Sequence, residues 1–142
     1  MSRLADQLKA IAIRYNITEV YAFGSRAAEI ARRLAGEVAP PASPESDVDI
    51  GVQPARGCRL TARDRVRVAV DLEDLLGARR VDLVVLLEAD PFLALDVIRG
   101  ELLFCADKDA QAEQELYVLR RAGDLAPYVR ERWKQIMTGS GS

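Results

Sequence analysis

The sequence predicts an α/β fold of the α+β type, in which a small mixed sheet of about four strands is flanked by helices. Two observations favour this class. Segments with helical spacing of apolar residues alternate along the chain with short segments rich in β-branched and aromatic residues. The 142 residues, 49% hydrophobic and 30% charged, also suffice for a compact core and are too apolar for disorder. We therefore expect a single domain over residues 1–142.

The individual elements follow from periodicity and from the residues that begin or end them. Apolar residues at positions 4, 8, 11 and 15 form one helical stripe, and Asn16 suits the end of that helix. Gly77 suits the end of a later helix, and Pro91 suits the first turn of another. Helices are expected over residues 4–15, 26–34, 61–76, 91–100 and 109–137, and strands over residues 17–23, 47–52, 81–87 and 101–105. Gly123 and Pro127 predict a break or kink in the last helix.

The sequence also predicts where two of the strands lie in the sheet. The segment 81–87 is almost continuously apolar, which predicts a central strand or one covered on both faces. The segment 101–105 is expected to be an edge strand. Between residues 36 and 46, glycine, serine and three prolines predict a loop.

Composition excludes several classes of function. The chain has 20 Lys and Arg against 22 Asp and Glu, so a net charge of -2 gives no general attraction to nucleic acid or to an anionic membrane. There is no histidine, and Cys58 and Cys105 lie far apart, which excludes a zinc site of cysteine and histidine. Any bound metal is therefore expected to have oxygen ligands.

The sequence also lacks the patterns of export and membrane insertion. Charged residues interrupt the N-terminal apolar positions, unlike the apolar core of a signal peptide. The longest apolar run, 81–87, is far shorter than the roughly 20 residues of a membrane-spanning helix. We expect a cytoplasmic protein with reduced thiols and no membrane partner.

A glycine and a serine stand where the first predicted strand meets the following helix. Gly24 and Ser25 would present backbone N–H groups and a hydroxyl at a helix N-terminus, where the helix dipole favours anions. This arrangement is suited to binding phosphate. Taken alone, the pair is a weak signal and is more often an ordinary turn, since Gly-Ser turns are common.

Two aspartates alternate with apolar residues in the second predicted strand. The period of two places Val48, Ile50 and Val52 toward a core and Asp47, Asp49 and Gly51 on the opposite face. Neighbouring carboxylates repel each other unless a cation lies between them, and hard oxygen ligands favour Mg²⁺ or Mn²⁺. The alternative is a solvated strand face, although aspartate is disfavoured in strands.

A third aspartate interrupts the apolar strand 81–87. An unpaired carboxylate at Asp82 would be costly to bury, so it needs a cation or a hydrogen-bond donor. If the second and third strands are adjacent, Asp82 can join the first two aspartates in a three-carboxylate site. Pairing with Arg79 or Arg80 is the alternative.

Three motifs, in this order, resemble the DNA-polymerase-β-like nucleotidyltransferase superfamily, and most closely its minimal nucleotidyltransferases. They are Phe23-Gly24-Ser25-Arg26-Ala27, Ser46-Asp47-Val48-Asp49-Ile50 and Val81-Asp82-Leu83-Val84. The resemblance extends from about residue 20 to 104 and implies a nucleotidyltransferase fold with a catalytic core over about 17–105. Residues 109–138 would then form a C-terminal helical segment.

The resemblance also implies roles for individual residues. In this family the Gly-Ser turn holds the β and γ phosphates, the aspartate pair binds two Mg²⁺ ions, and the third carboxylate helps one metal to activate the attacking hydroxyl. Carried over, nucleotide binding falls to Gly24, Ser25 and Arg26, and metal binding and catalysis to Asp47, Asp49 and Asp82. ATP would be the substrate. Mg²⁺ would be the metal, and Mn²⁺ is an alternative.

The chain departs from the family pattern between its first two motifs. Asp47 follows Ser25 by 22 positions, where the family has a short link. A predicted helix and the proline-rich loop fill this interval. Whether Arg26, Arg32 or Arg33 reaches the triphosphate is therefore left open.

The resemblance points to a partner protein as the acceptor, because a core of this size leaves no second domain to enclose one. Many minimal members are antitoxins encoded beside a HEPN-domain toxin, and they transfer AMP from ATP to a tyrosine of that toxin. The leading hypothesis is the same activity here, with the C-terminal helix as docking element in a hetero- or homo-oligomer. One alternative is an inactive nucleotidyltransferase-like module that binds and blocks a partner. Another is transfer to a small molecule or nucleic acid by an oligomer.

Overall fold

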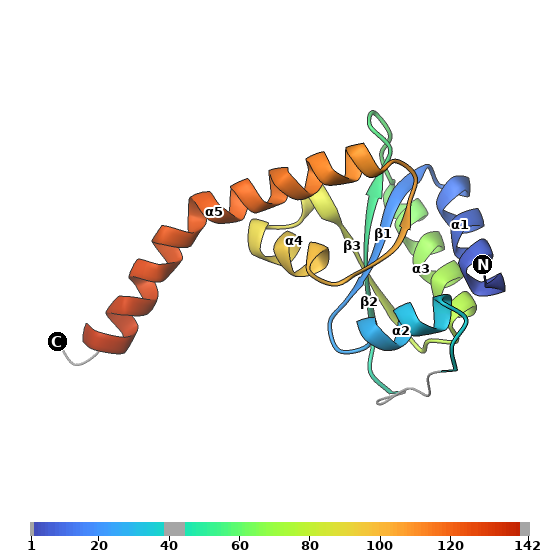
Figure 1. The fold of residues 1–142 in the computed structure, drawn as a ribbon, viewed down its shortest axis with the longest axis horizontal. Coiled ribbons are helices and arrows are strands. Elements are labelled where there is room, and N and C mark those ends of the chain that lie inside the picture. Colours follow the sequence, from blue (N-terminus) through green and yellow to red (C-terminus); the bar gives the residue numbers. More distant parts are fainter. Residues whose placement is uncertain (1, 39–44, 140–142) are drawn as a thin grey trace.

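The computed structural model describes residues 2–38 and 45–139, and the predicted order of helices and strands is confirmed (Figure 1). The elements are α1 (Arg3–Arg14), β1 (Ile17–Phe23), α2 (Ala27–Leu34), β2 (Val48–Pro54), α3 (Ala62–Leu76), β3 (Val81–Val85), a 3-10 turn (Leu86–Glu88), α4 (Pro91–Ile98), β4 (Glu101–Cys105) and α5 (Lys108–Gly139). Most of the predicted proline-rich loop, with its three prolines, falls on residues 39–44 and lies outside the described residues.

The four strands form one mixed sheet in the order β3-β2-β1-β4. Strand β1 is antiparallel to β2 and β4, whereas β2 and β3 are parallel. The predicted edge position of β4 is confirmed. A central position for β3 is wrong, because β3 pairs with β2 alone at the opposite edge. Its apolar sequence instead reflects cover on both faces, since Leu83 packs against one core cluster and Val84 against the other.

The helices lie in two layers on the two faces of the sheet. Helices α1, α2 and α3 cover one face and enclose the larger core cluster, whereas α4 and the first part of α5 cover the other (Figure 1). On the face covered by α4, strand β2 has a glycine at a position where a larger side chain would clash with α4. A Cβ atom on Gly51 would lie 2.3 Å from Cγ1 of Val97, so this glycine allows α4 to pack closely on β2.

Local interactions at the helix ends agree with the sequence signals. Helix α3 begins with a capping box, in which Thr61 and Asp64 each accept a hydrogen bond from the other's backbone N–H. It ends at Gly77, whose φ of 63° is the left-handed conformation expected after a helix. Asn16, with φ of 56°, similarly follows the end of α1. These residues fix where the strands that follow begin.

Helix α5 is 32 residues long and continues through Gly123 and Pro127. The predicted interruption is therefore not a break, although the helix bends part-way along (Figure 1). Its first half is attached to α4 and to the sheet, since Val118 is buried against α4 and Tyr21 donates a hydrogen bond to Glu115 at 2.7 Å. The second half extends away from the rest of the fold (Figure 1). Across the described ranges, no helix has the length and apolar character needed to cross a membrane.

Candidate functional site

Strand pairing brings the predicted aspartates to one end of the sheet. Asp49 of β2 is the register partner of Asp82 in β3, and the two strands are parallel. Register partners in adjacent strands point to the same face of a sheet. Asp47 lies directly before β2, two positions from Asp49 and therefore on the same side. The condition for Asp82 to join the pair, adjacency of the two strands, is confirmed.

The buried apolar side chains of β2 determine which face of the sheet the aspartates occupy. Val48, Ile50 and Val52 are buried in the core beneath α1, α2 and α3, as their alternation predicts. A one-residue register shift would exchange the buried valines and isoleucine for the aspartates. The orientation of the carboxylates is thus set by the hydrophobic core.

The Gly-Ser turn lies directly against the aspartate pair. Phe23, the last residue of β1, is the register partner of Asp49, so Gly24 begins the turn beside it. Gly24 has φ of 76°, and a Cβ atom there would lie 2.4 Å from Oδ2 of Asp49. Gly24 and Ser25 are both exposed. The structure therefore brings the first two motifs together despite the insertion between them.

The carboxylates influence one another electrostatically. The pKa of Asp49 is raised, first by burial and then by the negative charges of Asp82 and Asp47. A positive charge near this group would favour the ionised form and relieve the repulsion. The site thus has the electrostatic character of a cation-binding site.

Arg80, directly before β3, places a positive charge beside the other two aspartates. Nε of Arg80 lies 3.2 Å from Oδ1 of Asp82 and 4.0 Å from Oδ2 of Asp47. Asp82 therefore pairs with a neighbouring arginine, which is the alternative predicted from the sequence. This ion pair occurs together with the register pairing of Asp82 and Asp49. Arg79 points elsewhere and pairs with Glu45.

The donor set fits a hard divalent cation by its chemistry. Carboxylate oxygens without thiolate or imidazole favour Mg²⁺ or Mn²⁺ over Zn²⁺. Within the described residues, no three acidic or cysteine side chains are already grouped to hold a metal ion. Asp47 and Asp82 are turned to Arg80, so metal binding would require these two side chains to reorient.

A pocket of about 600 Å³ opens beside the Gly-Ser turn. Its lining residues come from three stretches of the chain, and are Phe23, Gly24, Ser25, Ala27, Ala28, Asp49, Asp96, Arg99, Gly100 and Glu101. Sequence reasoning missed the contribution from the end of α4 and the start of β4. That contribution depends on the pairing of Glu101 with Ala22 and on Gly100, where a Cβ atom would lie 2.2 Å from the carbonyl oxygen of Ala22.

The arginines of the first motif and of α2 have different surroundings. Arg26 is only 5% exposed, and its guanidinium donates to both carboxylate oxygens of Glu29 and to the carbonyl oxygen of Ser46. It therefore links α2 to the residue before Asp47. Arg33 donates to the carbonyl oxygen of Leu76 at the end of α3. A nucleotide contact from Arg26 stays a prediction.

Comparison with protein families agrees with this geometry. The sequence profile of the family described as Polymerase beta, Nucleotidyltransferase matches residues 6–109. The chain belongs to this nucleotidyltransferase family. The match spans both motifs, Asp82 and the β4 edge of the pocket. A search of curated proteins finds no significant match.

Solved structures show that the fold is shared over nearly the whole nucleotidyltransferase chain. A toxin–antitoxin complex with AMP-PNP matches with a TM-score of 0.66 and 20% identity, over 94% of this chain and 98% of that one. The MntA-HepT toxin–antitoxin matches with a TM-score of 0.67 and 18% identity, over 95% and 97%. A structure of the tri-AMPylated HEPN toxin of Shewanella oneidensis in complex with MNT antitoxin also matches with a TM-score of 0.67 and 18% identity, over 95% of this chain and 97% of that one.

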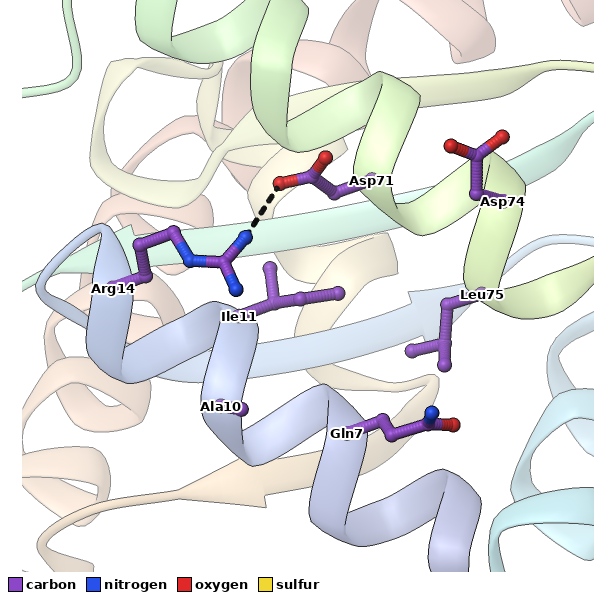
Figure 2. A pocket seen from close by; sticks show the side chains of 7 residues that line it. All are labelled: Gln7, Ala10, Ile11, Arg14, Asp71, Asp74 and Leu75. Atoms are coloured by element: carbon purple, nitrogen blue, oxygen red, sulfur yellow. Dashed lines mark hydrogen bonds and ion pairs between the residues drawn. The ribbon is translucent and has the colours of Figure 1, made fainter.

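A second pocket of the nucleotidyltransferase lies in the α1 and α3 layer, away from the strand ends. Figure 2 shows the two helices side by side, with Arg14 and Asp71 paired across them at 3.3 Å. The pocket encloses about 430 Å³ and is lined by Gln7, Ala10, Ile11, Arg14, Asp71, Asp74 and Leu75. None of the six predicted site residues lines it. The strand-end site is thus the candidate for nucleotide chemistry.

Proposed function

We propose that this protein is a Mg²⁺-dependent nucleotidyltransferase that transfers AMP from ATP to a hydroxyl of a partner protein, as the antitoxin of a HEPN-type toxin. The observation that carries the proposal is the contact of the Gly24 turn with Asp49, itself in register with Asp82, in a chain of the nucleotidyltransferase family. We further propose that residues 1–142 act as one domain in the cytoplasm.

Asp47, Asp49 and Asp82 would hold the metal, with two Mg²⁺ ions as the expected complement and Mn²⁺ as a substitute. When bound, the ions would supply charge neutralisation of the triphosphate and a lowered pKa of the attacking hydroxyl. The raised pKa of Asp49 agrees with this assignment, because a nearby cation would offset the burial and the repulsion that raise it.

The chain's own residues would bind and orient the nucleotide. Ser25 is exposed and offers a hydroxyl, and Ala28 in the first turn of α2 offers a backbone N–H at the positive end of a helix. Arg99 is the one basic side chain among the described residues that line the pocket. The pocket volume of about 600 Å³ is within the range of small-molecule sites, roughly 300–1,000 Å³. Gly24 and Ser25 are thus proposed to contact the β and γ phosphates.

The proposed acceptor is a tyrosine hydroxyl of the partner toxin. Similar folds occur in a toxin–antitoxin complex with AMP-PNP and beside an AMPylated HEPN toxin, which supports both nucleotide and acceptor. Helix α5 is the proposed docking element, because Leu116, Tyr117 and Leu119 are exposed on the half attached to the sheet. Exposed apolar side chains on one helix are a common feature of protein interfaces.

The second candidate function is a module that binds and blocks its partner without transferring a nucleotide. The contacts of Arg80 with Asp82 and Asp47 favour it, since they occupy the carboxylates that a catalyst needs. The enzyme is favoured by three aspartates on one face of the sheet beside a Gly-Ser turn, because a binding protein has no use for their repulsion.

The deciding experiment combines the protein with Mg²⁺, α-labelled ATP and the product of the neighbouring gene. The Asp47→Ala, Asp49→Ala double variant tests the site, and Asp71→Ala, Asp74→Ala on α3 is the matched control. If the wild type and the control variant label the partner and the site variant does not, the result supports the enzyme. Equal neutralisation of the partner by all three proteins without label would leave the binding module.

A further inference from the structure

The guanidinium of Arg80 reaches two of the three carboxylates from the solvent side. Its Nε lies 3.2 Å from Oδ1 of Asp82 and 4.0 Å from Oδ2 of Asp47. The side chain of Arg80 is 69% exposed, whereas those of Asp47 and Asp82 are 43% and 41% exposed. The arginine is therefore held by these contacts and can leave without disturbing packing.

The backbone of Arg80 is fixed beside the site. The N–H of Val48 donates to its carbonyl oxygen at 3.0 Å, which continues the β2–β3 pairing before Val81. The position of its Cα is thus coupled to the strand that carries Asp49. Only the side chain is free to change partner.

The preceding arginine offers a contrast. Arg79 pairs with Glu45 at 2.7 Å and makes no ion pair with Asp47, Asp49 or Asp82 among the described residues. Its side chain is 74% exposed, close to the value for Arg80. The two adjacent arginines therefore carry the same charge at similar exposure, but only Arg80 contacts the site.

We propose that Arg80 is a built-in counter-cation that competes with the divalent metal for Asp47 and Asp82. This inference rests on the proposed metal site. A metal ion that uses these oxygens must compete with the guanidinium, because both cations are attracted to the same two carboxylates. Free metal then binds more weakly than the three carboxylates alone would allow, and part of their negative charge stays offset when no metal is bound. Arg80 is a positioning residue in this scheme.

The size of the effect follows from the exposure of the pair. Exposed ion pairs contribute little, so removing Arg80 is expected to tighten metal binding by about two- to tenfold. The gain should shrink as ionic strength rises, because salt screens exposed charges.

The test is a titration with Mn²⁺ alone, followed by the electron paramagnetic resonance signal of free Mn²⁺, without nucleotide or partner. The variants are Arg80→Ala, Arg80→Gln, Arg79→Ala and the Asp47→Ala, Asp49→Ala pair. We expect tighter binding in both Arg80 variants, unchanged binding in Arg79→Ala, and loss of binding in the aspartate pair. Arg79→Ala removes the same charge one residue away, so it separates direct competition from net charge.

Equal affinities of Arg80→Ala and Arg79→Ala would overturn the proposal, and so would weaker binding in Arg80→Ala. These outcomes leave the metal site intact. Equal binding by wild type and the aspartate pair would instead remove the metal site, and the proposed function with it. Thermal unfolding of each variant checks that the affinities refer to folded protein.

Discussion

Gly24 and Asp49 are so close that a Cβ atom on the glycine would lie 2.4 Å from Oδ2 of the aspartate. The φ of 76° at Gly24 adds a second requirement for glycine at this position. The proposed phosphate-binding turn and the proposed metal ligand Asp49 are therefore not independent. A change in one displaces the other.

Gly24→Ala is expected to reduce transfer at least about 100-fold, because it forces Asp49 or the turn to move by about an ångström. Gly57→Ala is the matched control, since Gly57 has a similar φ of 83° but nothing within 4 Å of its Cβ position. Label transfer and thermal unfolding should be measured for both. Equal loss of activity in the two variants would show that backbone strain, and not the contact with Asp49, is responsible.

Asp49→Asn is expected to stabilise the metal-free protein at neutral pH by up to about 1 kcal/mol while abolishing transfer. The raised pKa of Asp49 means that the folded state binds its proton more tightly than the unfolded state. Its contribution to stability is thus lost as pH rises from the ordinary pKa through the raised one.

Urea unfolding in EDTA across that pH range measures this contribution. The wild type should lose stability relative to Asp49→Asn as the carboxyl ionises. Asp74→Asn, an exposed aspartate on α3, should follow the wild type. An Asp49→Asn variant that tracks the wild type at every pH would contradict the electrostatic account.

Arg99→Ala is expected to raise the KM for ATP about tenfold with a smaller change in kcat, because a charged contact with phosphate contributes to binding. Arg99 lines the pocket with Gly24 and Ser25. Arg32, an exposed residue of α2 outside the pocket lining, provides the control substitution. A change confined to kcat would place Arg99 away from the bound nucleotide.

Tyr21→Phe is expected to destabilise the protein by about 1–3 kcal/mol and to loosen the start of α5. The buried hydroxyl of Tyr21 donates to Glu115, and phenylalanine leaves that carboxylate without this donor. Hydrogen exchange should accelerate over residues 108–122 more than in β2. Tyr117→Phe, on the exposed side of the same helix, should change neither measurement.

Much of this arrangement can be predicted from the sequence because it depends on local periodicity. The alternation in β2 predicts which side chains are buried, and hence that Asp47 and Asp49 share a face. The place of β3 could not be predicted in this way. Apolar residues on both faces indicate cover by helices, and a covered strand can be central or at an edge.

Other features depend on contacts between distant segments. Arg26 stands in the first motif, yet Glu29 and the carbonyl oxygen of Ser46 bury its guanidinium. The choice of Arg80 over Arg79 for Asp82 depends on the direction in which each side chain leaves the backbone just before β3. No periodicity in the sequence carries that information.

The attachment of α5 has a mechanical consequence. A 32-residue helix is about 48 Å long, and the residues described above that attach it to α4 and β1, Glu115, Val118 and Ala122, all lie in its first half. A rotation of a few degrees about these contacts moves the far end of the helix by several times the displacement at Glu115. Small changes where the first half of α5 packs on α4 and β1 therefore produce larger displacements of anything bound near its far end.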